Sequence, residues 1–205
     1  MLRRITLVVA FVVLVAGLAA TAASAAATGF SGRATAVRAS VLGVTMAFAD
    51  TGPLPASGGS QQASFAAVNL PGVLTTGALT ASTEGRGNHS RSRTSAGDVD
   101  VLGGVITATA VESQAQASCR GGEPQTSGSS TLGSLAVLGQ PVAVVGSPVI
   151  TIPLLGITIA VNEQTSSTSG GHGEITVNAL HVTGPGIDIV VGSSSSDIDC
   201  KEAPA

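Results

Sequence analysis

The sequence predicts an all-β protein, folded as a single antiparallel β-sandwich-like domain. Val, Ile and Thr account for 47 of the 178 residues after position 27, and the same stretch holds 26 Gly and 9 Pro. β-branched residues favour strands, and Gly and Pro mark the turns between them. Because no part of this stretch keeps helical spacing, about ten short strands in one domain are expected. An open barrel or a β-helix is the alternative architecture.

Residues 1–27 are predicted to be a helical secretory signal peptide that precedes the fold. A pair of arginines comes before the apolar stretch 5–20, and small residues suited to cleavage fill 23–27. An uncleaved membrane anchor is the competing interpretation, and the clustered small residues favour cleavage. The mature chain is therefore expected to be residues 28–205, a single domain that is secreted and keeps no membrane anchor.

Alternating apolar residues predict individual strands along the mature chain. The clearest runs are VLGVTMAFA (41–49), with Leu42, Val44, Met46 and Phe48 on one face; GITIAVNEQ (156–164), with Ile157, Ile159 and Val161 on one face; EITVNALHV (174–182); and GIDIVVG (186–192). Clusters of Gly, Pro and Ser separate these runs and predict loops. The predicted loops are 51–60, 85–90, 120–130 and 165–173.

Two cysteines, Cys119 and Cys200, are the only pair in the chain. An exported protein reaches an oxidising compartment, so one disulfide between them is predicted. Two free thiols are the alternative, disfavoured because neither cysteine has a C-x-x-C spacing or a neighbouring histidine. The loop-entropy argument gives such a bridge about 4 to 5 kcal/mol of stabilisation.

Charge and aromatic content exclude several classes of function. Charged residues make up 10% of the chain, the formal charge is −3, and the only aromatic residues are four Phe. No nucleic-acid binding is therefore expected, nor a site that stacks sugars or bases on aromatic rings. One basic cluster, RGNHSRSRT (86–94), contains Arg86, Arg91 and Arg93. We expect a solvated loop or an edge strand there, with contact to an acidic cell-surface polymer as the alternative.

Motifs of common catalytic sites are absent from the sequence. There is no G-x-S-x-G, H-E-x-x-H or P-loop pattern. His172 lies in GGHGE, which predicts a hairpin turn. His181 falls on the alternation face of Ile175, Val177 and Ala179, which predicts a half-buried sheet residue. No catalytic residue and no cofactor is therefore predicted.

A calcium site is the metal-binding alternative. Asp188, Asp197 and Asp199 could gather with Glu163, because calcium takes six to eight oxygen ligands. No loop spacing brings these acids together, so ordinary surface carboxylates are expected and no metal ligand is assigned.

Several segments resemble a known family. They are SGRATAVRASVLGV, NLPGVLTTGALTAST, VDVLGGVITATAVESQAQASC, GITIAVNEQ, and EITVNALHV followed by GIDIVVGSSSSDIDC. In this order they resemble the choice-of-anchor P family of secreted bacterial proteins, over nearly all of residues 30–200. The resemblance implies an exported β-rich domain of unestablished function, from a group whose members carry differing C-terminal sorting signals. Only KEAPA follows Cys200, so a covalently sorted or membrane-held form is not expected here.

These observations favour a secreted, non-enzymatic β-domain that associates with the cell surface or extracellular matrix. Its expected partner is a cell-wall or surface polymer, or another surface protein. One alternative is a secreted hydrolase without a recognisable motif, built around His172, His181, Glu163 or Asp188. The other is a domain that binds calcium or a small ligand.

Overall fold

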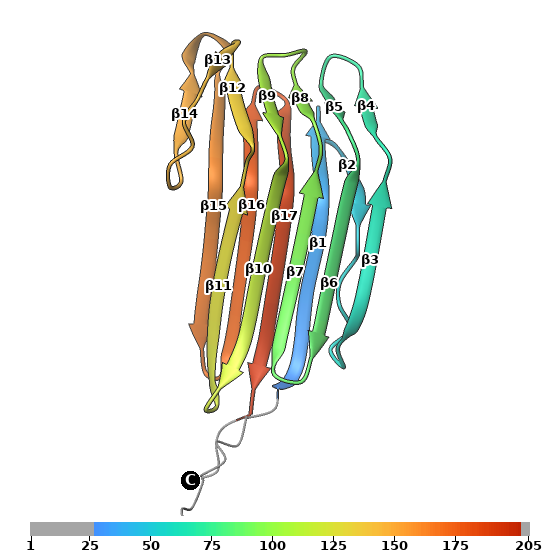
Figure 1. Ribbon diagram of the computed structural model, residues 1–205, viewed down its shortest axis with the longest axis vertical. Coiled ribbons are helices and arrows are strands. Elements are labelled where there is room, and N and C mark those ends of the chain that lie inside the picture. Colours follow the sequence, from blue (N-terminus) through green and yellow to red (C-terminus); the bar gives the residue numbers. More distant parts are fainter. Residues whose placement is uncertain (1–26, 202–205) are drawn as a thin grey trace, which may run out of the picture.

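The structure is a computed structural model that describes residues 27–201 and consists of antiparallel strands in three open sheets. We call the three sheets A, B and C. Figure 1 shows two layers, with sheets B and C placed end to end against sheet A. Sheet A has the order β14 (Val149–Ile152), β15 (Ile157–Ser169), β16 (His172–Gly184), β17 (Ile187–Cys200), β1 (Ala27–Val41), β2 (Val44–Asp50). The predicted all-β, sandwich-like class is confirmed, and the predicted signal peptide lies outside the described residues except for Ala27.

Sheets B and C are two halves of one strand layer. Sheet B has the order β11 (Glu123–Thr131), β10 (Val111–Arg120), β7 (His89–Ala96), β6 (Leu79–Arg86), β3 (Gly59–Phe65). Sheet C has the order β13 (Gln140–Pro141), β12 (Ser134–Val137), β9 (Ile106–Thr109), β8 (Val99–Val101), β5 (Leu74–Thr76), β4 (Val68–Leu70). Along the chain, each strand of sheet B is joined to a strand of sheet C by one or two residues that belong to neither strand. A short 3₁₀ helix, η1 (Pro153–Leu155), joins β14 to β15.

A row of irregular residues, which we call the bulge line, crosses sheet A at half height. Its five members lack a ladder partner: Ala49, Ala36, Gly192, Ala179 and Asn162. Ala49, Gly192 and Asn162 have positive φ angles of 48°, 74° and 54°. The register of each ladder is the same on both sides of this line, so all five strands share the irregularity and alternation can change phase across it without a change of pairing. Along β17, the buried core-facing residues accordingly change from odd to even numbers after Gly192.

The bulge line separates two different kinds of core. Between sheets A and C the interior is aliphatic, with Leu74, Ile106 and Ile159 fully or almost fully buried. Between sheets A and B much of the interior consists of small and hydroxyl-bearing side chains. The buried hydroxyl residues there are Thr83, Ser90, Ser92, Thr94, Ser113, Ser194 and Ser196.

Hydrogen bonds between hydroxyl groups satisfy the polar core. Ser113 Oγ lies 2.7 Å from Thr94 Oγ1 on the neighbouring strand and 2.6 Å from Ser194 Oγ across the layers. Ser196 Oγ donates to the carbonyl oxygen of Ala115 at 3.1 Å. Buried hydroxyls cost free energy unless they find such partners. Small side chains also let the layers approach closely, since a Cβ on Gly128 would lie 2.4 Å from Val177 Cγ2.

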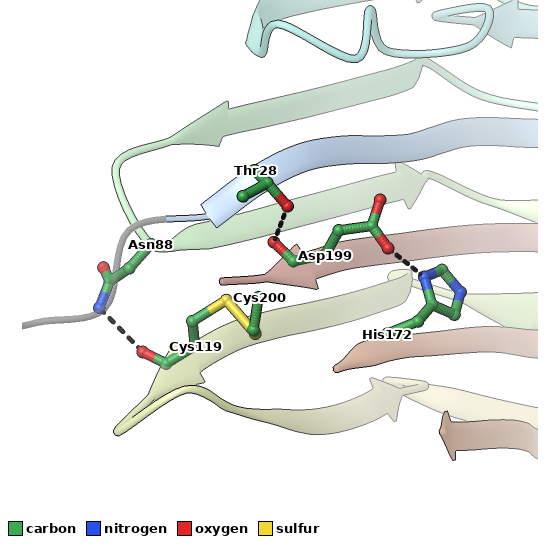
Figure 2. The surroundings of a disulfide bond; sticks show 6 residues. All are labelled: Thr28, Asn88, Cys119, His172, Asp199 and Cys200. Atoms are coloured by element: carbon green, nitrogen blue, oxygen red, sulfur yellow. Dashed lines mark hydrogen bonds and ion pairs between the residues drawn. A yellow bond between two sulfur atoms is a disulfide. The ribbon is translucent and has the colours of Figure 1, made fainter. Parts of the chain in front are cut away.

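The predicted disulfide is confirmed. Cys119 on β10 is bonded to Cys200 on β17, with 5.5 Å between the Cα atoms, so the bridge ties sheet B to sheet A at one end of the sandwich. Figure 2 shows its surroundings. The Asn88 side-chain amide donates to the carbonyl of Cys119 at 3.1 Å, and the Thr28 hydroxyl donates to the carbonyl of Asp199 at 3.3 Å.

Two predictions of local structure are wrong. The run 41–49 is not one strand, because Leu42 and Gly43 form the turn between β1 and β2, and Leu42 is 84% exposed. The expected loops 120–130 and 165–173 are mostly strand, with turns only at Gly121–Gly122 and Gly170–Gly171. Their Ser and Thr residues belong to β11 and β15, where ladder hydrogen bonds to β10 and β16 satisfy the backbone. The shared face of Ile157, Ile159 and Val161 is confirmed, because all three are buried.

Candidate functional site

The outer face of sheet B is a continuous surface of hydrogen-bonding side chains. Cross-strand pairing sets its rows, since residues directly opposite each other share a face. One row is Ser129, Gln114, Arg93, Ser82 and Gln62, and the next is Ser127, Gln116, Arg91, Glu84 and Ser60. Open hollows lie along these rows, one lined mainly by the same side chains and one that extends to the adjacent row of Thr80, Ser95, Glu112 and Thr131. We call this surface the B face.

The basic cluster of the sequence lies at the centre of the B face. Arg91 and Arg93 are on β7, which has β10 on one side and β6 on the other. The predicted solvated loop or edge strand is therefore wrong, because β7 is paired along both edges. Arg91 Nη2 donates to Gln116 Oε1 at 3.1 Å, while its Nε is buried without a hydrogen-bond partner among the described residues.

The two outer faces of the sandwich differ in charge. Among the described residues, the B face carries four arginines and three glutamates: Arg86, Arg91, Arg93, Arg120, Glu84, Glu112 and Glu123. The outer face of sheet A carries two arginines and six acids: Arg33, Arg38, Asp50, Glu163, Glu174, Asp188, Asp197 and Asp199. A chain with net negative charge thus presents one broad face that is not acidic.

His181 lies on the outer face of sheet A, between two carboxylates. Its Nδ1 is 3.1 Å from Glu163 Oε2, and its Nε2 is 3.4 Å from Asp188 Oδ1. Asn178 Nδ2 also donates to Glu163 at 2.8 Å, and this bond, followed by the one from His181, lowers the pKa of Glu163 despite opposing desolvation. The expected face of His181 is wrong, because the bulge at Ala179 reverses the alternation of β16.

This histidine cluster lacks the nucleophile that a hydrolase of the serine type needs. Such a site has a hydroxyl or thiol within hydrogen-bond reach of the base. In residues 27–201, the polar contacts of His181 are the two carboxylates alone. The two carboxylates orient the imidazole on the outer face of sheet A.

His172 belongs to a second acidic cluster near the disulfide. Its Nδ1 lies 2.8 Å from Asp199 Oδ1, as Figure 2 shows, and this contact raises the pKa of His172. Burial raises the pKa of the neighbouring Asp197. The predicted hairpin turn of GGHGE is confirmed at Gly170–Gly171, and His172 is the first residue of β16.

The four acids of the calcium alternative are not brought together. Asp188 lies near one end of β17 and Asp199 near the other, about 36 Å apart at the rise of an extended strand. Glu163 lies with Asp188 beside His181, whereas Asp197 lies in the His172 cluster. Within residues 27–201 no group of three or more His, Cys, Asp or Glu side chains is placed to hold a metal ion.

Sequence reasoning missed the glutamines and hydroxyls that make up most of the B face. The signal was the alternation of small residues with larger polar ones in ESQAQA (112–117). Its Ala and Ser at odd numbers fill the interior, and its Glu and Gln at even numbers face outward.

Comparison with known proteins gives no match to a family model, a curated protein or a solved structure. In the described part of the chain, no helix has the length and apolar character needed to cross a membrane.

Proposed function

We propose that the protein is an exported, non-enzymatic β-sandwich that attaches to an acidic, hydroxyl-bearing polymer of the cell surface through the B face. The observation that carries this proposal is the placement of Arg91 and Arg93 at the centre of a broad face of amide and hydroxyl groups. The resemblance to the choice-of-anchor P family, with its exported members, agrees with attachment at the cell exterior and remains part of the proposal.

The chemistry of the B face suits a polymer with many hydroxyls and some carboxylates. Ser, Thr and Gln side chains offer donors and acceptors to hydroxyl groups, and guanidinium groups bind carboxylates with two parallel bonds. Arg91 Nη2 donates to Gln116 Oε1 at 3.1 Å, which orients the guanidinium within its row of the B face.

The B face is expected to bind each repeat unit of the polymer weakly and the whole polymer strongly. The B face has no aromatic platform, so each sugar unit gains only hydrogen bonds and screened charge contacts. A polymer that presents many equivalent groups compensates by multivalency. The disulfide Cys119–Cys200 fits the exported location, because such bonds persist in oxidising compartments.

The test is affinity electrophoresis or pull-down with polygalacturonate, a carboxylate-bearing polysaccharide, against neutral dextran. The protein is expected to be retained by polygalacturonate and less by dextran, with retention that falls as salt is raised. The double variant Arg91→Gln/Arg93→Gln is expected to lose at least about tenfold in affinity, because two charge-assisted contacts are removed.

Arg38→Gln is the matched control, because it removes one arginine from the outer face of sheet A. It is expected to bind like the parent. Equal retention of the parent and the double variant would reject the B face as the binding surface. Failure to bind polygalacturonate or cell-wall material would reject the proposed function.

A further inference from the structure

Three hairpin tips at one end of the sandwich place a leucine in an unfavourable backbone conformation. Leu42, Leu102 and Leu138 have φ angles of 51°, 58° and 53°, and each is followed by a glycine with positive φ. For Leu42 and Leu138 this is the first central position of a two-residue hairpin turn, which prefers Asn, Asp or Gly, whereas Leu102 opens a four-residue loop. A leucine there carries a conformational cost, which suggests that its side chain serves another purpose.

Each tip is bonded through its backbone to a neighbouring turn of its own sheet. In sheet A, the Leu42 N–H donates to Gly186 O at 2.7 Å, in the turn between β16 and β17. In sheet C, the Leu138 N–H donates to Val105 O at 2.7 Å, and the Leu102 N–H donates to Val73 O at 2.9 Å. These bonds use the backbone alone, so they do not require leucine.

Packing accounts for Leu102 but leaves the other leucines at this end exposed. Leu102 packs against the aliphatic core, whereas Leu42 is 84% exposed and Leu138 is 58% exposed. The helix η1 adds Leu154, 98% exposed, and Leu155, 44% exposed. Gly156, which ends η1, lies against Pro185 in the β16–β17 turn, so η1 is next to the Leu42 tip. We call Leu42, Leu138, Leu154 and Leu155 the leucine end.

Charge is depleted around the leucine end. The segments 39–49, 66–78 and 132–161, which supply most of its tips, contain no charged residue. Most of the eighteen charged residues in 27–201 lie on the other side of the bulge line, toward the disulfide. Asp100, near the Leu102 tip, accepts a hydrogen bond from the Gly104 N–H at 2.6 Å. Figure 1 places the tips of sheet C at the end opposite the β6–β7 and β10–β11 hairpins.

We propose that the leucine end inserts into the uncharged acyl region of a lipid surface. Separate leucines that project from hairpin tips of both layers suit a fluid, apolar environment. A second copy of the chain is a poorer fit, because the four leucines together expose less than the ~800 Å² per partner of a typical stable interface. Anionic headgroups are also a poor fit, because the tips carry no basic residue to attract them.

The test is sedimentation of the chain from Ala27, which contains every described element, with phosphatidylcholine vesicles. The parent is expected to sediment with the vesicles. The triple variant Leu42→Asn/Leu138→Asn/Leu154→Ser is expected to lose at least about tenfold in partitioning, because three apolar side chains no longer enter the lipid. Asn adopts positive φ more readily than Leu, so the melting temperature of the variant is expected to be no lower than that of the parent.

Val145→Ser is the matched control, because Val145 is 82% exposed but lies outside the leucine end. It is expected to partition like the parent. Three results would overturn the proposal: absence of the parent from the vesicle pellet, equal partitioning of the triple variant, and a parent dimer in light scattering that the triple variant lacks. Arg91→Gln/Arg93→Gln should leave vesicle binding intact, which separates this test from that of the B face.

Discussion

Removal of the Ser113 hydroxyl tests whether the polar core stabilises the contact between the layers. Ser113 on β10 is 3% exposed, and its Oγ is shared between Thr94 on β7 and Ser194 on β17. In Ser113→Ala, Ser194 keeps a bond to the Ser113 backbone oxygen at 3.3 Å, whereas the Thr94 hydroxyl loses its one hydrogen-bond partner among residues 27–201. The expected cost is about 1 to 3 kcal/mol, the penalty for one buried unsatisfied hydroxyl.

A double-mutant cycle isolates that penalty from the loss of packing. Thr94→Val removes the stranded hydroxyl at nearly constant volume, so Thr94→Val/Ser113→Ala should cost less than the sum of the single variants by about 1 kcal/mol. The assay is urea denaturation, read as a change in midpoint at constant slope. Ser127→Ala on the exposed face of β11 is the control and should stay within about 0.5 kcal/mol of the parent. Strict additivity, or an unchanged midpoint for Ser113→Ala, would refute this account of the polar core.

Two further predictions concern the end of the sandwich that carries the disulfide. Replacing Cys119 and Cys200 by Ala opens a loop with a sequence separation of 81, and should lower the unfolding free energy by about 4 to 5 kcal/mol. The melting temperature should then fall by about 8 to 20 °C, and a fall of under 2 °C would contradict the loop-entropy estimate. The raised pKa of His172 means that its contact with Asp199 stabilises the fold fully below the ordinary histidine pKa, and that this contribution fades as pH rises through the raised value. The stability of His172→Ala, measured by melting curves, should therefore fall furthest below that of the parent under mildly acidic conditions. The difference should be less than about 1 kcal/mol, because both side chains are exposed. A stability difference that grows toward alkaline pH would contradict this prediction.

The sequence predicted the fold class and the disulfide correctly for physical reasons. Val, Ile and Thr favour strands at any place in a sheet, and two cysteines can form a single bridge. Serine was misleading, because the same residue type suits a loop, a polar core and an exposed strand face. The run SSSS at 193–196 alternates between outer and inner faces of β17, and its buried members, Ser194 and Ser196, bond across to β10.

The position of β7 could not be read from local pattern either. Three arginines and two serines in 86–94 predict exposure, and the arginine side chains are indeed on a surface. What the pattern omits is that Ser90, Ser92 and Thr94, which alternate with the arginines, face a second sheet that is itself rich in hydroxyls. Centrality in a sheet depends on partners far along the chain, and only the fold supplies them.

The bulge line explains the remaining error and connects the two proposals. Strict alternation places His181 with Val177 on the core face, but the irregularity at Ala179 turns it outward, where it meets Glu163 and Asp188. The same line divides an aliphatic half, which ends in exposed leucines, from a hydroxyl-lined half, whose outer surface is the B face. Because the two halves differ in core chemistry and in charge, the leucine end and the B face can be altered separately. Loss of vesicle binding without loss of polymer binding, and the reverse, is the outcome that this division predicts.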